Sequence, residues 1–351
     1  MKQDLNHVFN PEKGNKITFE ELHIRHLNLI KNIKTKSLNN WFLKMAITNT
    51  FDDLKVFLYN LKKGKNKVII AINQKKIVDY INIYPLNEKE TCLKISKPEL
   101  INNEFSISDK DIIKGLIKKA ISITDIKTSS WILNSDINNF DLISCARELG
   151  FQPLKEIKLW SLKTPIDKTN PTKIVSADHE EFHKINKLNL SKVLHFIRSN
   201  QSQLIRTILD FDQQDILNRN DFSSGVFIYN QSILCTILKD INYLNESIYT
   251  LTTGKCWDNR LNPSLRIFLN YFFKNNPSST IKTYAENIEL NSYLEKCNLF
   301  VKSQEIILVR NTIIKNEAKQ HNKINQSLES IFDKLNPQGN PYPSPFPLKS
   351  K

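Results

Sequence analysis

Asn139-Phe-Asp-Leu-Ile-Ser-Cys-Ala-Arg-Glu-Leu-Gly150-Phe151 decides the fold, because Asn287-Ile-Glu-Leu-Asn-Ser-Tyr-Leu-Glu-Lys-Cys-Asn298-Leu299 repeats its pattern later in the chain. The two stretches align without a gap, so Asn139 matches Asn287 and Gly150 matches Asn298. Glycine and asparagine tolerate the left-handed backbone that commonly ends a helix, and a strand-like run follows each stretch. Each copy therefore predicts one helix, one left-handed cap and one strand. Their separation of about 150 residues is a usual domain length, so the repeat predicts two similar domains in tandem.

Two pairs of earlier segments support the duplication. Residues 18–23 and 178–183 both predict the capped start of a first helix, because Thr or Asp is followed three positions later by Glu. Residues 68–78 and 226–234 both predict a strand, a polar turn and a second strand. Chance similarity between amphipathic segments is the alternative, but three matches in the same order favour duplication.

Length and composition agree with this organisation. A chain of 351 residues can bury two cores, and alternating helix-like and strand-like stretches predict α/β (α+β) domains, each a mixed central sheet flanked by helices. We expect a tail over residues 1–13, a first domain over residues 14–164 and a second over residues 165–311. Residues 312–335 predict a C-terminal helix. Residues 336–351 predict an extended, disordered proline-rich tail, with docking on an aromatic groove or on the protein's own domains as the alternative.

The composition also limits the cellular context. No run approaches the roughly 18 apolar residues that a membrane span needs, and the first residues lack the apolar core of a signal peptide. We therefore expect a cytoplasmic protein with no membrane partner. The five cysteines are scattered and form no Cys-x-x-Cys motif, so buried, reduced thiols are expected rather than disulfides.

The chain is basic, with 50 Lys and Arg against 36 Asp and Glu and a formal charge of +14. Such a charge suits nucleic acid or a phosphate-bearing cofactor. The basic residues are spread along the chain, however, and are neither Arg-rich nor interleaved with aromatic residues as in single-strand binding grooves. A nucleic-acid partner is therefore not expected.

In the second half the local signals are clearest. Residues 247–252 and 280–284 predict two strands. Between them, Asn262 at the N-cap and Pro263 at the first position predict a helix that runs through Phe273.

This element order, together with the closing unit, resembles the GNAT superfamily of N-acetyltransferases. The clearest match is Ala146-Arg-Glu-Leu-Gly-Phe151, echoed by Glu295-Lys-Cys-Asn298, and the likeness covers nearly the whole chain as two tandem domains. It implies that acetyl-CoA or another acyl-CoA binds between two splayed parallel strands. The diphosphate would lie at a helix N-terminus, where unpaired N–H groups and the helix dipole attract anions. It also implies acyl transfer to an amine acceptor, with no metal.

The resemblance places the cofactor loop of the family, Arg/Gln-x-x-Gly-x-Gly/Ala, at Arg260-Leu261-Asn262-Pro263-Ser264-Leu265, with proline and leucine at the glycine positions. Lys255 and Arg266 would add positive charge. Asn287 matches the CoA-contacting asparagine of the family, and helix capping is its alternative role. In the first domain the corresponding residues 104–111 contain no arginine, and two aspartates in the first helical turn would repel a diphosphate. The second domain is therefore the expected acyl-CoA site.

Candidate catalytic residues follow from the same resemblance. The tyrosine that protonates the thiolate in the family corresponds to Ala146 and Leu294, and Tyr293, one residue and about 100° away around the helix, is the candidate acid. Glu246, beside the predicted strand of residues 247–252, is the candidate base, with a solvated surface carboxylate as the alternative.

Residues 179–183 fit the His-Glu-x-x-His pattern of zinc peptidases. No third ligand lies at a suitable spacing, so we interpret the match as coincidence and expect no metal. The sequence thus predicts an N-acetyltransferase-like protein. Because the loop glycines and the tyrosine are missing, a catalytically inactive GNAT-like ligand-sensing or protein-binding module is the alternative.

Overall fold

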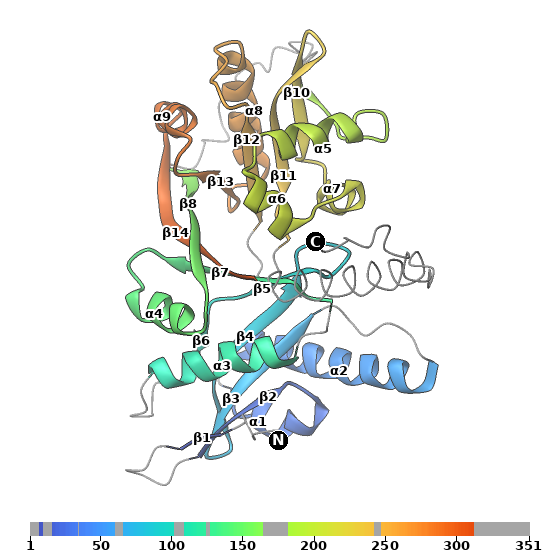
Figure 1. Cartoon of the computed structure of the whole chain (residues 1–351), viewed down its shortest axis with the longest axis vertical. Helices are drawn as coiled ribbons and strands as arrows, with labels where there is room; N and C mark the ends of the chain where they lie inside the picture. The colour runs from blue at the N-terminus through green and yellow to red at the C-terminus, as the bar shows by residue number, and fades with distance from the viewer. Residues whose placement is uncertain are drawn as a thin grey trace, which may run out of the picture. The chain divides into compact units, whose positions relative to one another are not determined.

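The structure is a computed structural model that describes residues 7–9, 16–33, 35–59, 66–101, 109–123, 127–163, 182–241 and 247–311. Residues Met1–Arg310 form one compact unit (Figure 1). Glu246, the expected domain boundary at residues 164–165, most of the zinc-like motif, and the C-terminal helix and tail lie outside the described residues.

The first half contains antiparallel strands, two parallel strands and helices on both faces of the sheet. Its elements in order are β1 (His7–Phe9), β2 (Lys16–Glu21), η1 (Ile24–His26), α1 (Leu27–Ile30), α2 (Lys36–Tyr59), β3 (Lys67–Asn73), β4 (Lys76–Pro85), β5 (Cys92–Ile95), β6 (Glu99–Leu100), α3 (Asp109–Ile123), β7 (Ser130–Asp136), α4 (Phe140–Glu148) and β8 (Gln152–Leu162).

The second half repeats this plan with shorter first helices. Its elements in order are β9 (Phe182–His183), α5 (Leu190–Ser199), α6 (Gln203–Leu209), α7 (Gln213–Arg219), β10 (Gly225–Tyr229), β11 (Ser232–Lys239), β12 (Ile248–Thr253), α8 (Leu261–Asn275), β13 (Thr280–Tyr284), α9 (Ile288–Lys296) and β14 (Leu299–Asn311).

Among the described residues, all strands belong to one sheet that runs through both halves. Its order is β1-β2-β3-β4-β5-β7-β14-β8-β13-β12-β11-β10-β9, and β6 pairs with β4 off this path. The closing strands are exchanged, because β14 lies beside β7 of the first half and β8 lies beside β13 of the second. β8 and β14 pair antiparallel along most of their length (Figure 1). Each half therefore completes its sheet with a strand from the other.

Hydrogen bonds define which positions of the two halves are equivalent. β5 pairs with β7 in parallel from Cys92↔Ser130, and β12 pairs with β13 in parallel from Ile248↔Thr280. The same backbone bond precedes each pair, from Leu86 N–H to Cys92 O at 2.8 Å and from Asp240 N–H to Ile248 O at 2.7 Å. Leu86 therefore corresponds to Asp240, and Cys92 corresponds to Ile248. The later residues of these strands correspond one to one.

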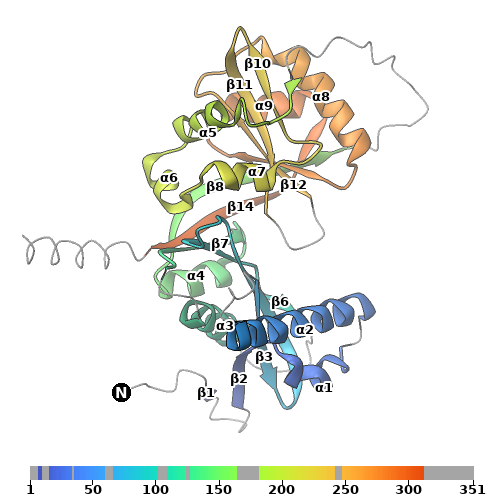
Figure 2. The same cartoon turned by 90° about the vertical axis from the view of Figure 1, so that its right-hand side faces the viewer.

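Helices cover both faces of the sheet because each presents one apolar stripe. In α3, Ile112, Leu116 and Ala120 recur at helical spacing and are buried in the core shared with α4, whereas α1 and α2 contribute to a separate core. In the second half α8 and α9 share one core, and α5 and α7 contribute to another. Figure 2 shows α5 and α8 on opposite sides of β10 and β11. Within the described ranges, none of the helices is long and apolar enough to span a bilayer.

Several sequence predictions are confirmed and others are wrong. The strand over residues 280–284 is confirmed as β13, and the left-handed caps are confirmed by φ angles of 86° at Gly150 and 63° at Asn298. The helix predicted to start within residues 18–23 is wrong, because Ile17 and Phe19 are buried at alternate positions of β2, the period of a strand.

The expectation of buried, reduced thiols is met only in part. All five cysteines are free; three are buried, but Cys256 is exposed in the segment after β12.

Candidate functional site

A gap opens between the parallel strands β12 and β13. Their ladder ends at the pair Thr250↔Lys282, while β12 continues to Thr253 in register with β11 only. Beyond Thr250 the edge of β12 that faces β13 therefore lacks a paired strand. Such a gap leaves backbone groups in the middle of a sheet without a strand partner.

A hollow lies on one face at this gap, between the end of β12 and the start of α9. We call it the α9 hollow; it is lined by Thr253, Gly254, Lys255, Trp257 and Glu286 to Leu290. Lys255 is exposed and Asn287 is half-buried. Two of the expected cofactor residues, Lys255 and Asn287, are thus brought together at the gap.

Asn287 differs from its counterpart in the first half. The Asn139 side chain accepts a hydrogen bond from Leu142 N–H at 3.1 Å and caps α4. Asn287 is the N-cap of α9 by position, yet its side chain makes no capping bond. Its amide is therefore not used by the helix that it begins.

The start of α8 holds most of the other expected cofactor residues. The helix begins at Leu261 with Arg260 at the N-cap, so the prediction of Asn262 as N-cap and Pro263 as first residue is wrong. The reason is a turn that starts the helix earlier, in which Leu261 N–H donates to Asp258 O and Asn262 N–H donates to Asn259 O.

That turn changes what the helix end can bind. The first two amides of α8 are already bonded, and Pro263 has none. Leu261 and Leu265 are 2% and 0% exposed and belong to the core, while Ser264 has a partner of its own. The helix end therefore offers few free donors to an anion, in contrast to an uncapped N-terminus.

Arg260 and Arg266 supply positive charge here. Arg260 forms an ion pair with Asp258 and donates to both of its carboxylate oxygens, and its guanidinium lies 4.5 Å from the ring centroid of Tyr229. The side-chain hydrogen bond from Arg260 holds the pKa of Asp258 at about 2. Arg266 is exposed on the next turn. Arg260 is thus available to a ligand only in competition with Asp258.

Tyr293, the candidate acid, lies on α9 beside the start of α8. Its hydroxyl donates to the Asn262 carbonyl, and its ring lies 5.1 Å from that of Trp257. Burial raises the pKa of Tyr293, so the phenol stays protonated. Leu294, the position equivalent to the family tyrosine, is fully buried in the core.

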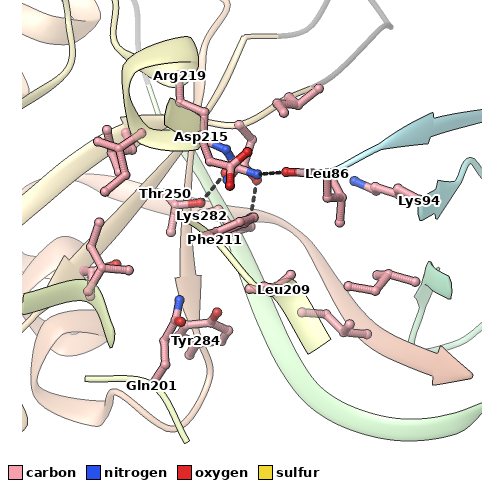
Figure 3. A pocket seen from close by; sticks show the side chains of 18 of the residues that line it. Leu86, Lys94, Gln201, Leu209, Phe211, Asp215, Arg219, Thr250, Lys282 and Tyr284 are labelled. Atoms are coloured by element: carbon pink, nitrogen blue, oxygen red, sulfur yellow. Dashed lines mark hydrogen bonds and ion pairs between the residues drawn. The ribbon is translucent and has the colours of Figure 1, made fainter. Parts of the chain in front are cut away.

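A second pocket lies on the other face of the gap, and we call it the central pocket. Figure 3 shows its lining, with Thr250, Lys282 and Tyr284 of β12 and β13 turned into it and Arg219 above them on α7. Strands β5 and β7 of the first half contribute Lys94, Ile132 and Asn134. The cavity has a volume of about 100 Å³.

Equivalent strands of the two halves meet in this pocket. From the parallel registers, Lys94 corresponds to Thr250, Ile132 to Lys282 and Asn134 to Tyr284. The contact between the halves is tied by Glu88 N–H donating to Asp215 Oδ1 at 2.7 Å.

A largely buried ion pair, with side-chain exposures of 20% for Lys282 and 13% for Asp240, forms part of the central pocket. Lys282 Nζ pairs with Asp240 Oδ2, and Thr250 Oγ1 donates to Asp240 Oδ1 at 2.5 Å. Burial alone would raise the pKa of Asp240, but the charges of Lys282 and Arg219 outweigh it and lower the pKa. Asp240 therefore stays ionised and is a poor proton acceptor.

Tyr284 closes the pocket at the end of β13. Burial raises the pKa of its phenol to about 12, and Lys155 lies 4.9 Å from its ring centroid. Its hydroxyl has no hydrogen-bond partner among the described residues.

The sequence analysis missed the central pocket, whose polar residues come from β5, β7, α7, β12 and β13 and from the segments after α5 and β11. No spacing along the chain brings these positions together. One signal was present, since Lys282 and Tyr284 occupy alternate positions of the strand next to the repeat and therefore face the same side of the sheet. Groups of three or more metal-ligating side chains do not occur in the part of the chain that the structure describes.

Comparison with known proteins gives likenesses in structure. No family model matches the sequence, and no curated protein matches it. A GCN5-related N-acetyltransferase from Sphaerobacter thermophilus is similar at a TM-score of 0.44 and 10% identity, over 74% of this chain and 85% of the other. A GNAT-family acetyltransferase from Colwellia psychrerythraea is similar at 0.44 and 9% identity, over 84% and 99%. A tandem GNAT protein from the clavulanic acid biosynthesis pathway is similar at 0.45 and 8% identity, over 84% and 98%.

Likenesses at these identities concern the fold alone. Independently of these scores, each half has the element order expected of a GNAT domain: antiparallel strands, a parallel pair with a connecting helix, and a closing helix and strand. The architecture is that of two GNAT-like domains in tandem.

Proposed function

We propose that this chain, built from two GNAT-like domains, transfers an acetyl or other acyl group from acyl-CoA to an amine acceptor in its second half. The observation that carries the proposal is the gap between β12 and β13 with a hollow on each face. Successive residues of a strand face opposite sides, and Thr252 lines the central pocket while Thr253 lines the α9 hollow. A thioester in one hollow and an amine in the other would meet at the gap.

The chemistry requires few protein groups. The amine nitrogen attacks the thioester carbonyl, a C–N bond forms, the C–S bond breaks, and the thiolate gains a proton as the amine loses one. Backbone amides of β12 beyond Thr250 are suited to stabilise the carbonyl oxygen as charge develops on it. The proposal keeps Glu246 as base and Tyr293 as acid, and adds Tyr284 as a second candidate donor because it lines the central pocket at the gap.

Recognition of the diphosphate would depend on side chains, because the first amides of α8 are already bonded. Lys255, Arg260 and Arg266 supply three cations near the α9 hollow or the α8 start. Because Lys255 and Arg266 are exposed, we expect affinity for acyl-CoA to fall steeply as ionic strength rises.

A catalytically inactive, ligand-sensing protein is the second candidate function. It is favoured by the bonded amides of α8 and by the ion pair that occupies Arg260. In that case the central pocket would bind a small molecule without any acyl transfer.

Thermal unfolding with acetyl-CoA, followed by thiol release with a panel of amines, tests the first function. Gly254→Leu should abolish both signals by filling the α9 hollow, since a Cβ at Gly254 meets only ordinary contacts and the fold should tolerate it. Ser232→Leu, at the exposed first residue of β11, is the matched control. Stabilisation without thiol release would favour the inactive module, and no stabilisation of the wild-type chain would refute an acyl-CoA site.

A further inference from the structure

The central pocket contains more positive charge than its own carboxylates neutralise. Lys94, Arg219 and Lys282 line it together with Asp215 and Asp240. Asp240 is paired with Lys282. Asp215 is 2% exposed, and its carboxylate accepts hydrogen bonds from the backbone of Glu88 and of Asp212 at 2.7 and 2.8 Å. Lys94 and Arg219 are left without an ion-pair partner among the described residues.

Arg219 is held with part of its guanidinium unused. One terminal nitrogen donates to Leu86 O at 2.8 Å, and the planar group lies 4.0 Å from the ring centroid of Phe211. Its Nε is buried and has no hydrogen-bond partner among the described residues. Buried donors are normally bonded, so an unpaired Nε beside a pocket indicates a missing acceptor.

Lys94 approaches the same pocket from the first half (Figure 3). Its described contact is with the Tyr84 ring, at 5.9 Å. Burial lowers the pKa of Lys94; the charges of Asp240 and Glu305 raise it in part, and those of Lys97 and Arg219 lower it further. Lys94 and Arg219 are both half-buried, and Asp240, which attracts both, is already paired with Lys282. Two such cations that repel each other are costly unless a further anion neutralises them.

We propose that the acceptor bound in the central pocket carries a carboxylate, held by Arg219 of the second half and Lys94 of the first, and an apolar body. The inference rests on the proposed function, since it names the acceptor of that reaction. A guanidinium fork matches the planar geometry of a carboxylate. The apolar body follows from the walls, which include Ile132, Leu194, Ile197 and Leu238. Free amino acids with apolar side chains combine both features with an amine.

The test measures binding to the full chain without any acyl-CoA, by calorimetry and thermal unfolding. The probes are leucine and phenylalanine, their uncharged carboxamides, and inorganic phosphate as an anion without an apolar body. The variants are Lys94→Met, which keeps side-chain length, and Arg219→Gln. Lys118→Met, an exposed lysine on α3, is the control with the same loss of charge.

We expect the amino acids to bind at least about tenfold more tightly than their carboxamides, as a charge-assisted hydrogen bond provides. This preference should disappear in Lys94→Met and Arg219→Gln and persist in Lys118→Met. If Arg219→Gln does not fold, Lys94→Met decides alone. Equal binding of acid and amide, no binding of either, phosphate binding as tight as that of the amino acids, or a preference that survives Lys94→Met would overturn the inference.

Failure of the proposed acyl transfer can be distinguished from failure of the carboxylate site. Carboxylate binding without thiol release would leave the anion site in place and refute acyl transfer. Thiol release with an amine that has no carboxylate, unchanged in Lys94→Met, would support acyl transfer and refute the anion site.

Discussion

The two halves place opposite chemistry at equivalent positions of one scaffold. Leu86 and Ile132 of the first half are apolar, whereas the equivalent Asp240 and Lys282 form an ion pair. The first turn of α3 carries Asp109 and Asp111, whereas that of α8 contains no acid. At these positions the first half therefore packs apolar side chains, whereas the second half places an ion pair beside its gap.

The largest expected effect on stability comes from replacing Lys282 of the second half by isoleucine, the residue at the equivalent position 132 of the first half. Lys282→Ile leaves Asp240 buried without its partner, which should lower the free energy of unfolding by about 3 kcal/mol. Urea denaturation measures the loss.

The double variant Asp240→Leu with Lys282→Ile copies the apolar pair fully and is the control. It should regain the wild-type free energy of unfolding or exceed it, because well-packed apolar residues often replace a buried pair without loss. A double variant as unstable as Lys282→Ile would show that the two positions are not equivalent.

The halves should also differ in their response to pH. Burial raises the pKa of Asp79 in β4 to about 7, whereas Asp240 has a lowered pKa. A raised carboxyl pKa means that the folded state holds the proton longer, so its contribution weakens as pH rises from about 4 to 7. The contribution of Asp240 is lost instead as pH falls through its lowered pKa.

Asp79→Asn should therefore raise the free energy of unfolding by about 2 kcal/mol at pH 8 and change it little at pH 4. Denaturation across pH checks this, with Asp136→Asn on β7 as the control. An unchanged pH profile in Asp79→Asn would contradict the assigned role of Asp79.

Kinetic measurements should distinguish the roles of Tyr284 and Tyr293. If Tyr284 donates at the gap, Tyr284→Phe lowers kcat about tenfold with little change in KM. If Tyr293 serves structure, Tyr293→Phe lowers stability by about 1 kcal/mol, because its bond to the Asn262 carbonyl is lost. Thiol-release kinetics would reassign the acid to Tyr293 if the two results were reversed.

The smallest expected effect is the difference in stability loss between alanine variants of the matched residues Asn139 and Asn287. Asn139→Ala should cost about 1 kcal/mol of stability, since Asn139 caps α4. Asn287→Ala should cost less and instead weaken acetyl-CoA binding, because Asn287 makes no capping bond. Thermal unfolding with and without acetyl-CoA measures both, and equal losses of stability would contradict the difference.

Sequence reasoning succeeded where local signals decide the structure. The matched helix starts at Asn139 and Asn287, and the left-handed residues Gly150 and Asn298, follow from backbone preferences within one turn. It failed at residues 18–23, where a capping pattern competed with the burial of alternate residues against α3. It also misplaced the start of α8, because a preceding turn can begin a helix earlier than its best capping residue.

The sequence by itself determined a duplicated α/β scaffold, since periodicity, turn residues and the repeated closing unit are properties of neighbouring residues. Tertiary structure alone decided that β8 and β14 are exchanged between the halves, because strand pairing depends on which edges meet in space. It also decided that Lys94 and Arg219, far apart along the chain, line one pocket. Charges interact through distance and burial, and the order of residues specifies neither until the chain has folded.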